Sequence, residues 1–438
     1  MKIAFENLGV IKKAEIDLSK KLTVLCGPNG TGKTYLCYAL YGFTYYTWIG
    51  SNIFSFTDLI EKKNITIELD TKILYDYYKR YSRPLSTNFN DIFGTSDKES
   101  SYKVLILENL DQFTERIKQS QFTFEYDDSS QLRITYTKKS NSNQLRIEAK
   151  MSSQRIITPS RWRESNLNAR LMKYLCFNSI VNSVILPVER NSVYTFISDL
   201  TVNSFDKNSF SINEEKIKDT YPLAIKELMK TAADLNRIKL IKGKYAYLAD
   251  SIEAEILHGN ISVSENGELL FAPKGTVGIA LSVHLTASII KNLSGLLIYL
   301  RHQAKKGDLL IIDEPEIGLH PDNQVLLARI FARLINNGLR LVISTHSDHI
   351  IRELNNLIML SSDKPEIKAI KEKYGYKDDE QIKCDDINAY LFDFGKDGNA
   401  IVHPVSIEEN GFEISSIDAE INKLNKISDD LYDTLNYE

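Results

Sequence analysis

Residues 27–34, GPNGTGKT, have types and a spacing suited to binding phosphate groups. Glycines allow backbone N–H groups to turn inward around phosphate oxygens. A lysine adds positive charge near the β- and γ-phosphates, and a threonine hydroxyl can bind Mg²⁺. We therefore predict a phosphate-binding loop whose binding residues are Asn29, Gly30, Thr31, Gly32, Lys33 and Thr34.

Two adjacent carboxylates follow an apolar run much later in the chain. Residues 308–316 read DLLIIDEPE, so a predicted buried strand ends at Asp313 and Glu314. An Asp at the end of a strand can hold Mg²⁺ directly or through water, and the next acid can orient and deprotonate an attacking water. We assign Asp313, together with Thr34, to the metal and Glu314 to the catalytic base.

A histidine follows a third apolar run. Residues 340–350 read RLVISTHSDHI, which predicts a strand over 341–343 and a loop that carries His346. On that loop the imidazole would contact the γ-phosphate. The alternative is a metal site made of His346, His349 and Glu353, but zinc sites need three or four convergent ligands with supporting hydrogen bonds. The position after a third strand favours the phosphate contact.

These three groups require elements that bring them together. A mostly apolar run, 22–25, precedes the loop, and a stretch that could be helical follows it. A helix in that position would add its positive N-terminal end to the phosphate site. About 280 residues separate Lys33 from Asp313, far more than a compact α/β domain places between such motifs. We call this predicted α/β domain the head. A large subdomain must therefore be inserted.

The middle of the chain reads as this insertion. Stretches such as NITIELD (64–70) and QFTFEYDD (121–128) alternate apolar and polar residues, which predicts antiparallel strands with a solvent face. Residues 183–186 return to a buried strand, followed by Arg190, for which we keep two roles open: contact with the nucleotide or a partner, and a structural salt bridge.

The predicted segments are 1–48, the N-terminal part of the head; 49–180, an inserted α+β platform or lid; 181–205, a head strand; 206–258, a helical segment; 259–365, the C-terminal part of the head; and 366–438, a mixed segment with a final helix.

The final helix is amphipathic. Ser415 and Asp418 are spaced as a capping box, and apolar residues from Ile417 to Leu435 recur on one face. That apolar face must be covered, either by the rest of this chain or by a partner subunit.

Composition limits the class of protein. The chain has 438 residues, 43% hydrophobic and 26% charged, with a formal charge of −4, which describes an ordinary globular protein. Any nucleic-acid surface must therefore be local. No signal peptide or membrane-spanning run is visible, and four scattered cysteines indicate neither a disulfide framework nor a zinc site. We expect a cytoplasmic protein.

The set GPNGTGKT, LLIIDEPEIGLHP and ISTHSDHI resembles ABC-type ATPase heads, in the AAA15/AAA21 branch of SMC, RecF and OLD-like proteins. The resemblance implies an α/β fold: an ABC-type P-loop ATPase head with a large inserted α+β subdomain and a short helical segment. It implies ATP and Mg²⁺ as cofactors, Glu314 as the base and His346 as the switch histidine. It also implies a homodimer, or a higher oligomer, formed through the heads.

One expected feature of such heads is weak here. ABC heads carry a signature before the DEP strand that reaches the ATP of the opposite subunit. The corresponding stretch is HLTAS, 284–288, which lacks a Gly-Gly pair. Thr286 and Ser288 would form a shortened trans signature, or Ser288 would be an ordinary helix N-cap.

Residues 299–360 are similar to stand-alone, OLD-like ATPases of bacterial anti-phage defence systems, most of all that of PARIS, then those of Septu and retrons. This resemblance implies an ATPase that oligomerises and holds a separate toxic effector, such as a Toprim-type nuclease, until a phage-encoded trigger protein is sensed. It carries no nuclease domain of its own and needs no membrane. The alternative is a RecF-like, ATP-gated DNA-repair protein, with DNA contacts from basic stretches at 155–163 and 239–244.

Overall fold

A computed structural model describes residues 1–46, 53–81, 88–95, 102–127, 132–151, 161–177, 180, 182–195, 221–276 and 278–436. The predicted insertion, 49–180, and helical segment, 206–258, are therefore described in part.

The centre of the molecule is a mixed sheet of nine strands, in the order β5-β1-β2-β16-β15-β3-β14-β13-β9. The five neighbours β15, β3, β14, β13 and β9 run parallel, whereas β1 is antiparallel to both β2 and β5. The strands are β1 (Lys2–Leu8), β2 (Ile11–Asp17), β3 (Leu22–Cys26), β5 (Lys103–Ile106), β9 (Ser183–Leu186), β13 (Leu309–Asp313), β14 (Arg340–Thr345), β15 (Ile387–Phe394) and β16 (Ala400–Val405).

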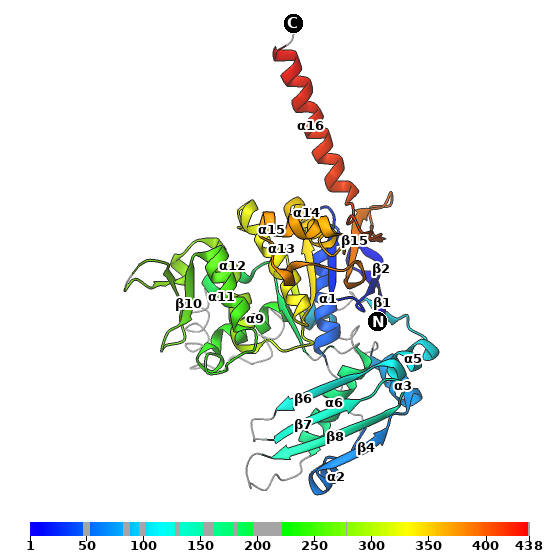
Figure 1. The fold of residues 1–438 in the computed structure, drawn as a ribbon. Coiled ribbons are helices and arrows are strands. Elements are labelled where there is room, and N and C mark those ends of the chain that lie inside the picture. The colour runs from blue at the N-terminus through cyan, green and yellow to red at the C-terminus, as the bar shows by residue number, and fades with distance from the viewer. Residues whose placement is uncertain are drawn as a thin grey trace.

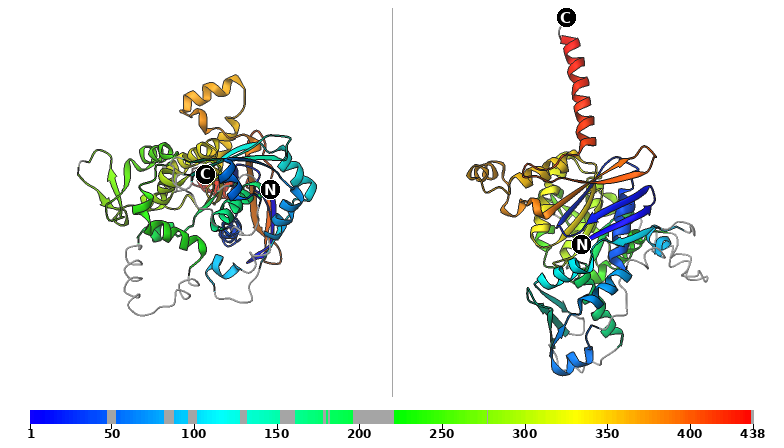
Figure 2. Two further views of the ribbon diagram at one scale, coloured as in Figure 1. Left: turned by 90° about the horizontal axis from the view of Figure 1, so that it is seen from below. Right: turned by 90° about the vertical axis from the view of Figure 1, so that its right-hand side faces the viewer.

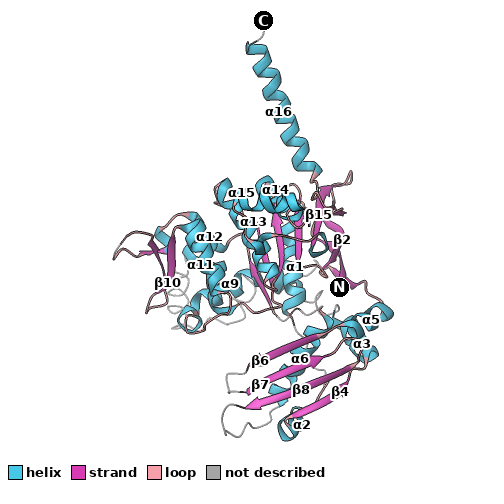
Figure 3. Cartoon of the chain, in the orientation of Figure 1, coloured by secondary structure: helices cyan, strands magenta, loops and turns pink. Residues whose placement is uncertain are grey.

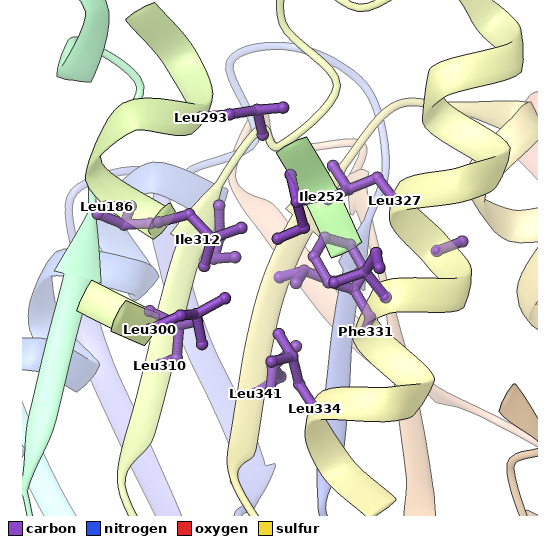
Figure 4. Packing of buried hydrophobic residues seen from close by; sticks show 14 of the residues in the cluster. Leu186, Ile252, Leu293, Leu300, Leu310, Ile312, Leu327, Phe331, Leu334 and Leu341 are labelled. Carbon is purple, nitrogen blue, oxygen red and sulfur yellow. The ribbon is translucent and has the colours of Figure 1, made fainter. Parts of the chain in front are cut away.

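Helices cover both faces of the parallel strands because those strands are apolar on both sides. In β13, Leu310 and Ile312 pack with one hydrophobic cluster, and Leu309 and Ile311 with another. Figure 4 shows the first cluster, where Leu327, Phe331 and Leu334 of α13 meet Leu310, Ile312 and Leu341 of the sheet. The second cluster joins α1 to the inserted subdomain.

A side lobe, residues 221–276 and 278–303, lies to the left of the head in Figure 1. The helices of the head and its side lobe are α1 (Lys33–Tyr45), α9 (Leu223–Ala233), α10 (Leu235–Ile238), α11 (Ala246–Ile252), α12 (Ser288–Ile298), α13 (Pro321–Asn336), α14 (Asp348–Met359), α15 (Pro365–Tyr374) and α16 (Ser415–Asn436). A small sheet of β10 (Gly259–Val263), β11 (Leu269–Pro273) and β12 (Leu281–Ser282) lies at the edge of the side lobe (Figure 1). Among the described residues, no helix combines the length and the apolar character needed to cross a membrane.

The inserted subdomain forms a separate layer below the head in Figure 1. Its four strands pair antiparallel in the order β4-β8-β7-β6, and its helices pack around this sheet and against α1. The elements are α2 (Phe56–Lys62), β4 (Asn64–Glu68), α3 (Thr71–Tyr81), α4 (Phe89–Phe93), α5 (Leu110–Gln119), β6 (Phe122–Asp127), β7 (Leu132–Lys138), β8 (Gln144–Met151) and α6 (Arg161–Cys176). The alternating pattern of the sequence matches these strands, as Figure 3 shows by secondary structure.

The sheet crosses two of the predicted segment boundaries. β15 and β16 come from 366–438, which the sequence placed outside the head, yet β15 pairs directly with the central strand β3. β5 comes from the predicted insertion and pairs with β1 at the sheet edge. Strand pairing between distant parts of the chain leaves no local sequence signal, so the sequence did not show that both segments join this sheet.

Candidate nucleotide-binding site

Three adjacent parallel strands bring the predicted site residues to one edge of the central sheet. β3 pairs with β14, with Cys26 opposite Thr345, and β14 pairs with β13, with Ser344 opposite Asp313. Each strand therefore ends at the same level, and its following loop carries a predicted group. Such an edge, beyond the carboxyl ends of parallel strands, is where open α/β sheets bind ligands.

The loop after β3 has a backbone that requires glycine. Gly27, Gly30 and Gly32 all have positive φ, at 139°, 77° and 89°. A Cβ at Gly27 would lie 2.1 Å from the carbonyl oxygen of Phe392 in β15. Gly32 is the N-cap of α1, so the N-terminal end of that helix points into the loop. The loop is thus shaped by β15 on one side and by α1 on the other.

Lys33 folds back over this loop. Its ammonium donates hydrogen bonds to the carbonyl oxygens of Gly27, at 2.9 Å, and Pro28, at 2.8 Å. Burial lowers the pKa of Lys33, while the nearby carboxylates of Glu314 and Asp313 oppose that shift. Asn29 and Gly30 are exposed at the tip of the loop, and the Thr31 hydroxyl donates to the Pro28 carbonyl at 2.8 Å. A buried cation whose described hydrogen bonds go to neutral carbonyl oxygens is suited to pairing with an anion.

Asp313 has an oxygen that a cation would satisfy. The side chain is fully buried, and its Oδ1 accepts a hydrogen bond from the Ser344 hydroxyl. Its Oδ2 is buried and has no hydrogen-bond partner among the described residues. Burial raises the pKa of Asp313, and the hydroxyls of Ser344 and Thr34 oppose this rise. An unpaired buried carboxylate oxygen beside a threonine hydroxyl fits Mg²⁺, which takes one or two protein ligands together with substrate phosphates.

Glu314 is held in an unusual backbone conformation. Its φ is +46°, and its N–H donates to the backbone carbonyl of Ser344, at 3.2 Å, and to the Ser344 hydroxyl, at 3.0 Å. Non-glycine residues in this region are held by their surroundings and cluster at functional sites. Burial, and then the charge of Asp313, raises the pKa of Glu314. A carboxylate with a raised pKa accepts a proton more readily, as a general base must.

His346 faces Glu314 across the site. Its Nε2 lies 3.7 Å from Glu314 Oε1, and about 29% of its side chain is exposed. Burial, and then the Lys33 charge, lowers the pKa of His346 to about 4. The imidazole is therefore neutral at pH 7, and one of its ring nitrogens can donate a hydrogen bond.

The alternative metal site at His346 is not assembled. Glu353 instead accepts hydrogen bonds from Arg329, at 2.7 Å, and from Tyr376, at 3.2 Å. Within the described part of the chain, no three His, Cys, Asp or Glu side chains converge in the manner of a metal site. Helical spacing placed His349 and Glu353 near one another, but the tertiary packing of α14 turns Glu353 toward α13.

Arg190 and Glu316 complete the site and were not assigned these roles from sequence. The Arg190 guanidinium donates to the backbone carbonyls of Asp313, at 2.7 Å, and Glu314, at 2.8 Å. It also donates to those of Pro187 and Asn292, and it forms no salt bridge with the residues that the structure describes. Its side chain is buried, so it is not open to a ligand. Burial lowers its pKa to about 10, which leaves it charged at neutral pH. The sequence signals for Arg190 were its place after a buried strand and the P-x-E-R pattern of residues 187–190, which resembles a feature of related ATPases.

Glu316 braces the loop that carries His346. Its Oε1 accepts hydrogen bonds from the Thr345 hydroxyl, at 2.9 Å, and from the His346 N–H, at 2.6 Å. Its other oxygen is buried and without a hydrogen-bond partner in the described structure. Glu316 thereby links the loop after β13 to the loop after β14.

The signature-like residues lie at the start of α12. Ala287, not Ser288, is the N-cap, and it makes no side-chain cap, so the N-cap interpretation of Ser288 is wrong. Ser288 is exposed beside Gly318, where an added Cβ would approach its Oγ to 3.0 Å. The Thr286 hydroxyl donates to the Val283 carbonyl at 2.6 Å. No described contact joins either residue to the phosphate loop of the same chain, and their trans role stays a prediction.

Comparison with solved structures finds SMC head domains at low similarity. One is an SMC head bound to the C-terminal winged-helix domain of ScpA, with 12% identity, a TM-score of 0.37, and coverage of 93% of this chain and 98% of that one. The SMC head from Thermotoga maritima has 12% identity, a TM-score of 0.33, and the same coverages. The head from Pyrococcus furiosus has 13% identity, a TM-score of 0.37, and 98% coverage of each chain. Scores this low assign no function.

Comparison of sequences identifies a relative and a family. The chain is 39% identical over 77 residues to YhaQ of Bacillus subtilis (strain 168), an uncharacterized ABC transporter ATP-binding protein. This match covers 16% of the chain and only 26% of YhaQ. The sequence model described as an AAA ATPase domain matches residues 1–351, about four fifths of the chain. The chain therefore belongs to the AAA ATPase domain family.

Proposed function

We propose that this chain binds ATP with Mg²⁺ at the edge formed by β3, β14 and β13 and hydrolyses it there. The observation that carries the proposal is the convergence of Lys33, Asp313, Glu314 and His346 on that edge from three separate stretches of sequence. Loop N–H groups and Lys33 would hold the phosphates. Thr34 and Asp313 would hold Mg²⁺, which supplies charge neutralisation at the transferring phosphoryl group.

The remaining residues have separable tasks. Glu314 would orient the attacking water and accept its proton, with its position fixed by Arg190 and Ser344. His346, neutral at pH 7, would donate a hydrogen bond to the γ-phosphate. Because Glu316 holds the His346 backbone, the two loops would respond together to the presence of that phosphate.

We further propose that two heads close over the nucleotide. Glu314 and His346 remain partly exposed, at 28% and 29%, so the edge is not sealed within one chain. Ser288, exposed at the start of α12, and the half-buried Thr286 just before it provide a surface that a second head could present to the site. Closing the site would exclude water and strengthen every charge interaction within it.

The biological role that we propose is control of a separate effector in bacterial anti-phage defence. Its support is the resemblance of residues 299–360 to stand-alone defence ATPases. In this role, ATP-dependent closure of the heads would hold a toxic partner, such as a Toprim-type nuclease, and sensing of a phage protein would release it.

A DNA-repair role has less support. The basic stretches expected to bind DNA lie on different parts of the fold: Arg161 and Arg163 are on α6 of the inserted subdomain, whereas Lys239, Lys242 and Lys244 lie between α9 and α11 (Figure 1). Arg155 lies outside the described residues.

Affinity purification of the chain from its host, with and without ATP, tests the role. Recovery of a stoichiometric protein partner with toxic or nuclease activity supports the defence proposal. Recovery of the chain with nuclease-sensitive DNA and without such a partner contradicts it and favours the DNA-repair role. Hydrolysis itself is tested separately by steady-state release of phosphate from ATP by the purified chain.

A further inference from the structure

The last helix, α16, leaves the head with an uncovered apolar face. Its side chains from residue 423 to residue 436 are all exposed, and Leu424, Leu431 and Leu435 expose 55%, 60% and 83% of their surface. With Ile427 they recur at spacings of three and four, which forms one stripe along the helix. Figure 1 and the right-hand view of Figure 2 both show α16 running away from the body of the protein. An apolar stripe of this kind marks a contact surface.

A complementary groove lies between α14 and α15. It has a volume of about 380 Å³ and is lined mainly by apolar and aromatic side chains: Met359, Leu360, Ile367, Ile370, Tyr374 and Tyr376. Helix α15 has no buried residue, and Ile370 and Tyr374 are 42% and 59% exposed. Grooves between helices commonly receive the apolar face of another amphipathic helix.

The charges of the two surfaces are opposite. Residues 364–373, at and in α15, contain four lysines and two glutamates. Residues 427–436 of α16 contain Asp429, Asp430 and Asp433 and neither lysine nor arginine. Lys364 and Lys368 form no ion pair with any other described residue. The helix that borders the apolar groove therefore carries net positive charge, with Lys371 already paired to Asp378, whereas the end of α16 is apolar and acidic. These opposite charges favour the pairing of the two surfaces.

The position of α16 keeps its apolar stripe away from the α14/α15 groove of the same chain. Just before the helix, Phe412 is tied to α14, because its N–H donates to the Asn355 side chain at 3.0 Å and its carbonyl accepts from that side chain at 2.8 Å. The next residue of α14, Asn356, lines the groove. At about 1.5 Å per residue, Leu424 and Leu435 lie about 14 Å and 30 Å along the helix from Ser415. The groove is thus beside the start of α16, while the stripe is carried away from it.

We propose that α16 of one copy packs its Leu424–Leu435 stripe into the α14/α15 groove of a second copy, and that the second copy does the same in return. The two helices then run antiparallel between the heads, and the contact is the same on both copies, as two-fold symmetry requires. This contact is independent of ATP and of the surface at which heads would close over nucleotide.

Sedimentation of the full chain without nucleotide, in a Lys33→Ala background, tests the contact. We expect a dimer whose association weakens at least tenfold with Leu431→Asp and with Ile370→Asp, because each places a charge in the apolar contact. The matched control is Lys426→Asp, which puts the same side chain on the opposite face of α16 and should leave the dimer intact. A monomeric parent chain, or association unchanged by both apolar-to-charged substitutions, overturns the proposal.

Cross-linking identifies the occupant of the groove. Two copies with different tags would be mixed, one carrying Ile370→Cys and the other Leu431→Cys. Both copies would also carry Cys384→Ser, and the remaining cysteines are buried. A short bismaleimide should join the two tags. A control chain carrying both cysteines, examined at high dilution, should not cross-link internally. Efficient internal cross-linking in that chain would assign the groove to its own α16 and overturn the exchange.

Discussion

The guanidinium of Arg190 donates a 2.7 Å hydrogen bond to the backbone carbonyl of Asp313, at the point where β13 ends. A second bond, to the carbonyl of Glu314, fixes the next residue in its left-handed conformation. The proposed metal ligand and the proposed base are therefore positioned through their backbone by one buried side chain from β9's loop.

Replacement of Arg190 tests this arrangement. Arg190→Lys should lower the free energy of unfolding by about 2–4 kcal/mol, because a lysine cannot reach all four carbonyls and leaves buried acceptors unpaired. ATP hydrolysis should fall as well, while ATP binding through the loop is retained. Chemical denaturation and phosphate release measure the two effects. The control is Arg161→Lys on the exposed start of α6, and equal behaviour of the two variants would contradict a positioning role.

Lys33→Ala should weaken ATP binding at least tenfold and leave the fold intact. The ammonium is the cation nearest the loop carbonyls, and its removal takes away the charge that would pair with phosphate oxygens. Titration with a fluorescent ATP analogue measures the affinity, and thermal unfolding checks the fold. Lys12→Ala, a change at an exposed lysine of β2, serves as control. Unchanged affinity in Lys33→Ala would refute the loop assignment.

Glu314→Gln should bind ATP normally but hydrolyse it about 10²–10⁴-fold more slowly, because the amide cannot accept a proton from water. Single-turnover measurements separate the chemical step from binding. Glu316→Gln is an informative comparison, since Glu316 only braces the His346 loop and should reduce turnover less. Normal turnover in Glu314→Gln would place the base elsewhere.

Gly27→Ala should destabilise the protein by about 2 kcal/mol or more and abolish ATP binding. An alanine Cβ there would meet the Phe392 carbonyl at 2.1 Å, so the loop or β15 must shift. Gly398→Ala separates this clash from backbone strain, because Gly398 has a positive φ of 78° with nothing within 4 Å of an added Cβ. If the two variants unfold alike, β15 does not press on the loop.

The lowered pKa of His346 predicts how the free energy of unfolding depends on pH. Its pKa in the folded protein, about 4, is lower than the usual 6.5, so between these values the unfolded chain binds more protons. Stability should therefore fall as the pH drops from about 6.5 toward 4. His346→Gln should remove about 2 kcal/mol of the loss between pH 7 and pH 5. Urea denaturation at the two pH values measures it, and an identical loss in both proteins would contradict the shifted pKa.

Much of the candidate site could be predicted from sequence because its chemistry is encoded locally. The spacing from Gly27 to Thr34 by itself predicts a phosphate loop, and an apolar run ending in Asp313 and Glu314 predicts a strand with carboxylates at its carboxyl end. Alternating polarity likewise predicted the strands of the inserted layer. Each of these signals depends on neighbours within about ten residues.

Tertiary structure decided what depends on distant partners. The sequence of 366–438 predicts a mixed segment, but not that β15 pairs with β3 and brings the Phe392 carbonyl close to Gly27. Arg190 became a brace, rather than a ligand or half of a salt bridge, only because β9 lies beside β13. Burial and the nearby Lys33 charge made His346 neutral. Strand order, burial and electrostatic surroundings are set by long-range packing, and a single sequence carries no local record of them.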